Sequence, residues 1–153
     1  MYIHTMSGEL DLSLMRNCVC FNLRRTTRAL TQFFDVELRR HGIRPTQTPI
    51  LTALAAKSDW SMETLSKWLG MERTTLLRNL RPLQRDGLVR AKGGGQGRHV
   101  ELKLTEKGRG ALAEMLPAWR SAQDRAVAIL GKKRWSTIIG DLDKVAAQLK
   151  KGE

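Results

Sequence analysis

The sequence predicts a mainly α-helical fold that carries one small β-hairpin. Over most of the 153 residues, apolar side chains recur three and four positions apart, as they do along one face of a helix. One short segment near residue 100 instead alternates apolar and charged residues, and glycines follow the helical segments. The length suits one domain of ordinary size and is too short for two large ones.

The first predicted helix covers about residues 10 to 40, which contain no Gly or Pro, and Gly42 is expected to end it. Its apolar stripe consists of Met15, Val19, Leu23, Leu30 and Phe33. Thr46 is expected to cap a second helix. The residues that this second helix should bury are Ile50, Leu51 and Leu54.

Two more helices are predicted on either side of Gly70, which should end the first of them. Ser61 is the expected cap of this short helix. Its apolar residues are Met62, Leu65, Trp68 and Leu69. The second helix lies in MERTTLLRNLRPLQRDGLV, and its apolar face consists of Leu76, Leu80 and Leu83. Pro82 removes one backbone donor, so a bend or loosened turn is expected near residues 79–82, before Gly87 ends the helix.

A β-hairpin and two terminal helices complete the predicted order. In VELKLT, the residues that share one strand face are Val100, Leu102 and Leu104. Residues 88–91 can pair with this strand across the glycine-rich KGGGQGR loop. Thr105 is expected to start a long helix that Pro117 interrupts, and Gly131 separates it from a last helix. The apolar residues of that last helix are Trp135, Ile138, Ile139, Leu142, Val145 and Leu149.

The chain has a formal net charge of +12 and a pI of about 10.5, more than solubility requires. Such an excess indicates a polyanionic partner, usually nucleic acid or an anionic membrane surface. No apolar run is long enough to span a membrane, the N-terminus lacks signal-peptide features, and the basic residues are spread over several segments. Nucleic acid is therefore the expected partner, a membrane is not, and the cytoplasm is the expected compartment.

Cys18 and Cys20 are the only cysteines, and on one helix they would point about 200° apart. A bond between them within that helix is therefore not expected. Together with His4, His41 and His99 they match no zinc-ligand spacing, and no metal or other cofactor is expected. An enzyme is not expected either, because there are no paired carboxylates, no nucleophile beside a base and no phosphate-binding loop.

A short helix, a glycine turn, a basic helix and a β-hairpin follow one another within residues 46–107. This order predicts an α+β winged helix-turn-helix, whose second helix enters a DNA major groove about 12 Å wide. Residues 10–45 and 108–150 then form a helical dimerisation region, because terminal helices with two apolar faces usually bury one against a second subunit. The residues expected in this homodimer interface include Trp119, Trp135, Leu142 and Val145.

Five residues of the basic helix form the predicted contact surface for double-stranded DNA: Arg73, Thr74, Thr75, Arg78 and Asn79. Arg can donate two hydrogen bonds to guanine and Asn can pair with adenine, whereas Thr hydroxyls more often bind phosphate. Arg90 and Lys92 are expected to neutralise phosphates. Ser61 is a cap first and a phosphate contact second. For each of these residues, the alternative is an ordinary solvated position.

Two segments, LSKWLGMERTTLLRNLRPLQRDGLV and GRHVELKLTEKG, resemble the MarR family of transcriptional regulators. The resemblance implies an obligate dimer, a pseudo-palindromic operator, and often a small-molecule or oxidant signal that releases DNA. It also implies that Arg98, at the hairpin tip, reaches a minor groove, where the neighbouring glycines leave it room. Most members have an acidic residue two positions before this arginine. Here Gln96 stands there, so a more mobile wing is expected.

MarR-like dimers generally bind small ligands between the dimer helices and the winged domain, so a pocket is expected where the first, second and fifth helices meet. The predicted lining is Cys20, Leu23, Thr27, Phe34 and Leu51. Such a pocket suits an aromatic or lipophilic effector, and Arg16 or Arg24 could hold a carboxylate on it. The expected function is that of a homodimeric, sequence-specific regulator, preferably a repressor, which an effector releases from its operator.

Two alternatives remain open. The segment CFNL, which begins at Cys20, resembles the start of a peroxide-sensing branch of the family. The positions that match the two tyrosines activating that branch's thiol are Phe34 and Pro45, which donate no hydrogen bond. A thiol without a donor or cation beside it keeps a high pKa and reacts slowly, so a buried structural cysteine is favoured over a thiol sensor. A non-specific architectural DNA-binding protein is the second alternative.

Overall fold

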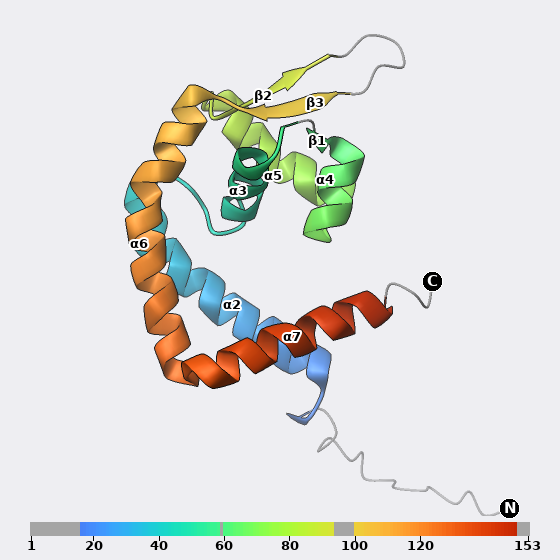
Figure 1. Cartoon of the computed structure of the whole chain (residues 1–153), viewed down its shortest axis with the longest axis vertical. Helices are drawn as coiled ribbons and strands as arrows, with labels where there is room; N and C mark the ends of the chain where they lie inside the picture. The colour runs from blue at the N-terminus through green and yellow to red at the C-terminus, as the bar shows by residue number, and fades with distance from the viewer. Residues whose placement is uncertain (1–15, 59, 94–99, 150–153) are drawn as a thin grey trace, which may run out of the picture.

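The structure, a computed structural model, describes residues 16–58, 60–93 and 100–149. Its elements are α2 (Val19–Leu38), the 3-10 turn η1 (Arg39–His41), α3 (Thr48–Ala56), β1 (Trp60–Ser61), α4 (Met62–Leu69), α5 (Arg73–Arg85), β2 (Val89–Lys92), β3 (Glu101–Leu104), α6 (Glu106–Leu130) and α7 (Lys132–Leu149). Figure 1 shows α3, α4 and α5 gathered beside the β-hairpin, whereas α2, α6 and α7 extend away from it as long helices.

The first described helix, α2, begins at Val19, later than the sequence predicts, and residues 10–15 lie outside the described residues. Cys18 precedes the helix with an extended backbone (φ −63°, ψ 117°). The two cysteines therefore do not share one helix, and the separation expected of two helical residues does not apply to them. After the single 3-10 turn, Gly42 adopts the left-handed region (φ 66°), which confirms it as the stop.

Thr46 does not cap α3, contrary to the prediction. The helix begins at Thr48 with a proline in its first turn, and its N-cap residue Gln47 makes no side-chain cap hydrogen bond. Gln47 Oε1 instead accepts from the backbone N of Arg44 at 2.9 Å, which closes the turn before the helix. The Thr46 hydroxyl points elsewhere and donates to Asn79 Oδ1 at 2.9 Å. The predicted apolar face of α3 is buried: Ile50, Leu51 and Leu54.

The two helices α4 and α5 form the predicted helix-turn-helix. Ser61 caps α4 reciprocally: its Oγ accepts from Thr64 N at 3.0 Å, and the Thr64 hydroxyl accepts from Ser61 N at 3.1 Å. Gly70 ends α4 in the left-handed region (φ 62°), as predicted. The apolar face of α5 is buried: Leu76, Leu80 and Leu83. α5 runs through Pro82 to Arg85 as one continuous helix, because burial of this face outweighs one lost backbone hydrogen bond.

The hairpin forms as predicted, and a third strand joins it. β2 pairs antiparallel with β3, so that Ala91 lies opposite Leu102. The strand β1, which the sequence pattern did not predict, pairs with the other edge of β3 and places Trp60 opposite Leu102. The sheet order is therefore β1-β3-β2. A strand of two residues shows too little alternation to be recognised in a sequence.

The long helix α6 continues through Pro117, so the interruption predicted there does not occur. α6 packs against α2, and this packing offsets the loss of one backbone donor. Thr105 starts the helix as predicted, with its Oγ1 accepting from Gly108 N at 3.0 Å. The same hydroxyl donates to Gly87 O at 2.7 Å, which ties the end of α5 to the start of α6. Gly131 (φ 82°) then separates α6 from α7.

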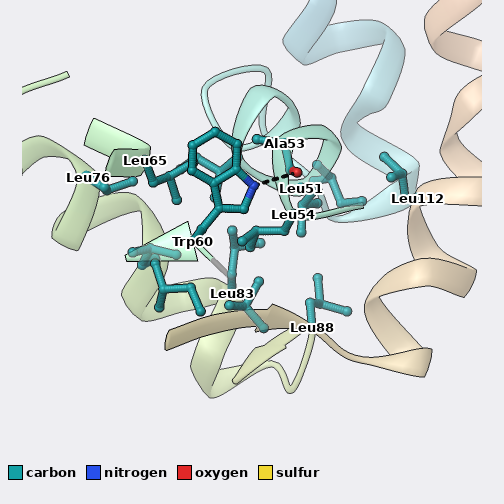
Figure 2. Packing of buried hydrophobic residues seen from close by; sticks show 14 of the residues in the cluster. Leu51, Ala53, Leu54, Trp60, Leu65, Leu76, Leu83, Leu88 and Leu112 are labelled. Atoms are coloured by element: carbon teal, nitrogen blue, oxygen red, sulfur yellow. Dashed lines mark hydrogen bonds between the residues drawn. The ribbon is translucent and has the colours of Figure 1, made fainter. Parts of the chain in front are cut away.

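One apolar core joins the winged part of the chain to the first half of α6. Figure 2 shows this cluster, in which Trp60 directs its indole Nε1 to Ala53 O over 2.9 Å. The core also takes Leu38 from the end of α2, and Leu112 and Met115 from α6. None of the residues of α7 is buried. The core therefore holds α5 firmly while leaving the far helices largely uncovered.

Candidate nucleic-acid interface and ligand cavity

The helix α5 rests on its buried leucines and presents a cationic face to solvent. The predicted contact residues that are exposed are Arg73, Thr74 and Arg78, and those that are half-buried beside the core are Thr75 and Asn79. Arg81 is also exposed, three residues after Arg78, which places both guanidiniums on one face of the helix. Arg81 was not among the predicted contacts, although its spacing from Arg78 could have identified it.

Asn79 is held by hydrogen bonds at both ends of its amide. Its Oδ1 accepts from Thr46 Oγ1 at 2.9 Å, and its Nδ2 donates to Thr75 O at 2.9 Å. A bidentate contact to adenine needs the same two atoms, Nδ2 as donor and Oδ1 as acceptor. An adenine contact would therefore have to share both atoms with these internal hydrogen bonds, through the second N–H of Nδ2 and the second lone pair of Oδ1.

An ion pair at the end of α5 distinguishes Arg85 from the other arginines of the helix. Arg85 Nε lies 2.9 Å from Asp86 Oδ1. The hydrogen bond from Arg85 lowers the pKa of Asp86, and the same bond raises the pKa of Arg85. Among the described residues, no ion pair involves Arg78 or Arg81. Arg73 is likewise exposed and in none of these ion pairs, so three arginines of α5 differ from Arg85 in this respect and can bind an anionic partner.

The wing carries two predicted phosphate contacts within the described part of the chain. Arg90 and Lys92 are both exposed on β2. Arg98 and Gln96, with the glycines beside them in the hairpin loop, lie outside the described residues. Ser61, the secondary phosphate candidate, uses its hydroxyl in the α4 cap.

A cavity of about 380 Å³ lies where α2, α3 and α6 meet. Small-molecule sites usually measure roughly 300–1,000 Å³. The lining consists of Thr27, Leu30, Thr31, Phe34, Leu38, Pro45, Thr48, Pro49, Thr52, Met115, Leu116 and Trp119. No charged side chain is among these described residues, and their polar side-chain groups are threonine hydroxyls and one indole N–H. Thr48 and Thr52 donate their hydroxyl hydrogens to backbone carbonyls, so the wall of the cavity is mainly apolar.

The cavity lies where a pocket is predicted, but its lining differs from the prediction. Thr27 and Phe34 line it, whereas Leu51 is fully buried in the core because α3 turns its threonine face to the cavity. Trp119 also lines the cavity, although it was expected in a dimer interface. The lining residues of α6 were missed because sequence spacing along α6 does not show which of its faces meets α2.

Two arginines lie at a neighbouring depression of about 290 Å³, which Leu23, Arg24, Thr27 and Arg28 line. Thr27 belongs to both this depression and the cavity, so the two adjoin. Leu23 and Arg24, which were predicted for the pocket itself, thus lie beside it. Arg16 is exposed and lines neither space.

In the single chain Cys20 is exposed and Cys18 is half-buried, so one subunit alone does not bury Cys20 as the interpretation of a structural cysteine requires. The physical reason is that α2 buries only Leu38, which leaves its first turns open to solvent. Cys20 is also absent from the cavity lining, whereas Phe34 and Pro45, the positions compared with activating tyrosines, belong to it.

Apolar side chains remain on the surface of α2 and α7. The exposed ones are Val19, Phe21, Leu23, Leu30 and Val36 on α2, and Ile139, Leu142, Val145 and Leu149 on α7. Among the described residues, no cluster of three or more His, Cys, Asp or Glu side chains could hold a metal ion. Within the same ranges, no helix has the length and apolar character to cross a membrane.

The geometry agrees with solved structures of transcriptional regulators. MosR of M. tuberculosis, solved in complex with DNA, is 38% identical over 86% of this chain and 98% of its own, with a TM-score of 0.75. A MarR-family regulator from Silicibacter pomeroyi is 26% identical over 84% of this chain and 87% of its own, with a TM-score of 0.64. The repressor CouR, solved with p-coumaroyl-CoA, is 23% identical over 90% and 98% and shares the fold, with a TM-score of 0.78. No protein-family model and no curated protein sequence matches the chain.

Proposed function

Because the chain belongs to the MarR family of DNA-binding transcriptional regulators, we propose that it is a homodimer that binds a pseudo-palindromic operator in double-stranded DNA. A small apolar effector in the cavity releases the dimer, and repression is the expected consequence of binding. The proteins to which the chain is similar are transcriptional regulators, not enzymes.

The observation that supports operator binding best is the cationic face of α5. Arg78 and Arg81 are exposed, and the helix beneath them is fixed by leucines that are at most 2% exposed. A helix presented in this way fits the major groove, where guanidiniums can bind guanine edges or phosphates. The net charge of +12 supports attraction to the phosphate backbone.

The exposed apolar residues of α2 and α7 support a homodimer. Contiguous apolar surface on a soluble protein usually marks an interaction site. A two-fold symmetric dimer presents two copies of α5, so its half-sites should lie about one helical turn of DNA apart, roughly 34–36 Å.

The cavity supports an aromatic or lipophilic effector. Phe34 and Trp119 offer ring contacts, and the lining carries no charge. A carboxylate on such an effector would be directed through the mouth at Thr27 toward Arg24, with Arg28 one turn further along α2. Among the structural neighbours, CouR is described with p-coumaroyl-CoA and BpsR with 6-hydroxynicotinic acid, and both compounds contain an aromatic ring.

Selection of duplexes from a random library, followed by binding in excess competitor DNA, tests the proposal. The full-length protein should enrich a palindrome and prefer it by roughly 10³-fold or more. Equal binding to all duplexes would instead favour a non-specific architectural protein.

Arg78→Ala then tests the role of α5. If Arg78 contacts a base, the variant relaxes preference at one position of each half-site. If it contacts a phosphate, all sequences weaken alike and the salt dependence falls by about one unit per half-site. Wild-type affinity across all duplexes would contradict the assignment of α5.

The exposure of Cys20 favours a second candidate, a thiol-based peroxide sensor. Under the effector proposal, Cys20→Ser and the wild type respond alike to stoichiometric organic peroxide. Loss of operator binding by the oxidised wild type, but not by Cys20→Ser, would establish the thiol sensor instead. Cys18→Ser, which alters the residue just before α2, shows whether the effect is specific to Cys20.

A further inference from the structure

One hydrogen bond joins the recognition helix α5 to the rim of the cavity. Thr46 Oγ1 donates to Asn79 Oδ1 at 2.9 Å, across a separation of 33 residues. Thr46 directly follows Pro45, which lines the cavity, and Asn79 directly follows Arg78 on α5. In the described part of the chain, no other side-chain hydrogen bond links a residue of α5 to the segments around the cavity.

The turn that carries Thr46 is closed by hydrogen bonds between Arg44 and Gln47, so Pro45 and Thr46 lie within one closed turn. Gln47 N donates to Arg44 O at 2.8 Å, and Arg44 N donates to Gln47 Oε1 at 2.9 Å. Gln47 is only 4% exposed, so the turn is anchored. A ligand that displaces Pro45 therefore displaces Thr46 with it.

The other end of the bond is equally well held. Asn79 Nδ2 donates to Thr75 O at 2.9 Å, which fixes the amide against the backbone of α5. A displacement of Thr46 that is transmitted through Asn79 Oδ1 should therefore move α5 itself, because the Asn79 side chain is not free to rotate. The exposed guanidiniums of Arg78 and Arg81 belong to that same helix.

We propose that Thr46 is a positioning residue, through which occupancy of the cavity alters the placement of α5 and weakens DNA binding. The inference rests on the proposed effector function. It assigns Asn79 to this coupling and not to adenine recognition. Because coupling between two sites is reciprocal, operator DNA should weaken ligand binding by the same factor as the ligand weakens DNA binding.

The test uses N-phenyl-1-naphthylamine, a neutral aromatic fluorophore, as the probe. Operator affinity of the full-length protein is measured with and without the probe, and probe affinity with and without the operator. The wild type should show a reciprocal factor of roughly 5–150, the usual range for such coupling. Thr46→Val, which removes the hydroxyl and keeps the shape, should bring the factor close to one. Thr46→Ser, which keeps the hydroxyl, should retain it.

A second variant fills part of the cavity with a side chain, so that no probe is needed. Leu116→Trp places a larger side chain in the cavity wall on α6. This substitution should weaken operator binding more when residue 46 is the wild-type threonine than when it is combined with Thr46→Val. Unfolding temperatures of both Thr46 variants serve as a control, and they should stay near the wild-type value because Thr46 is exposed.

Two results would overturn the inference. One is a wild-type coupling factor retained in Thr46→Val, which would assign the coupling to apolar packing between α3 and α5. The other is an operator affinity that neither the probe nor Leu116→Trp changes, which would show that the cavity does not act on α5. Failure of the proposed function is distinguishable, because the wild type would then show no operator preference before any probe is added.

Discussion

The winged part of the chain, from α3 to the start of α6, buries most of its apolar residues, with Trp68 and Leu77 as exposed exceptions, whereas the long helices α2 and α7 bury almost none. In the winged part, Ile50, Leu65 and Leu80 are at most 1% exposed. Along α2 only Leu38 is buried, and along α7 no residue is. Leu149 of α7 is 73% exposed. The chain itself therefore buries most apolar side chains of the winged part, whereas apolar faces of α2 and α7 remain exposed to solvent.

This contrast separates two requirements of the proposed function. The core beneath α5 keeps the arginine face rigid, as base recognition requires. In the proposed homodimer, the uncovered helices would pack against the partner subunit and so set the distance between the two copies of α5. The cavity lies between the two parts, where α2 and α6 meet α3, so a ligand there is placed to change that distance.

The largest expected effect tests the completeness of the winged part. A Cβ at Gly108 would lie 2.1 Å from Leu88 O and 2.7 Å from Leu104 Cδ1, at the point where α6 joins the sheet. Gly108→Ala should therefore lower the free energy of unfolding by about 3 kcal/mol or more, measured by urea denaturation. Gly110→Ala, on the same helix with nothing within 4 Å, should stabilise by up to about 1 kcal/mol. Similar effects of the two substitutions would contradict the close approach.

The next pair of variants contrasts the two parts directly. Leu80→Ala removes a buried side chain and should cost about 2–5 kcal/mol. Leu142→Asp alters an exposed side chain of α7, so it should dissociate the dimer, as sedimentation velocity would show. A stable dimer of Leu142→Asp would mean that α7 serves something other than the interface.

Arg81→Ala and Arg85→Ala compare an arginine of α5 that is in none of the ion pairs of the described residues with one that pairs with an aspartate. Because Arg81 has no ion pair within the described residues, its loss should weaken operator binding by about 1.5–3 kcal/mol, the usual contribution of a hydrogen bond to a charged group. Arg85→Ala should have a smaller effect, since Arg85 already pairs with Asp86. Fluorescence anisotropy on the selected operator measures both. A larger loss for Arg85→Ala would place the DNA at the other end of the helix.

The smallest expected effect concerns Ser61. Ser61→Ala removes the α4 cap and should cost about 1 kcal/mol of stability. Ser61→Asp retains a capping acceptor, so thermal unfolding should show near wild-type stability. If Ser61 also faces a phosphate, the new charge in Ser61→Asp will weaken operator binding. Unchanged binding would limit Ser61 to its structural role.

Local signals in the sequence were sufficient for most helix ends. Gly42, Gly70 and Gly131 end their elements, and Ser61 and Thr105 begin theirs, as predicted. These features depend on backbone conformation and hydrogen bonds within one turn, so nearby residues decide them. The buried leucines of α5 were also predictable, because their spacing alone defines one face of a helix.

At the two prolines inside helices, tertiary packing has a larger effect on helix continuity than the local sequence. Pro117 predicted an interruption, yet α6 continues through it, and α5 likewise continues through Pro82. The cost of one missing backbone donor is local, whereas the apolar contacts that offset it come from other elements of the fold.

By itself, therefore, the sequence determined the order of the helices and of the β-hairpin, the cationic face of α5 and the presence of apolar faces on the long helices. The tertiary structure alone decided that Leu51 enters the core, that Trp119 faces the cavity, and that Cys20 is exposed. It also decided that Thr46 reaches Asn79 instead of capping α3. The physical reason is that periodicity shows which residues share a face of one helix, but not which other element that face meets.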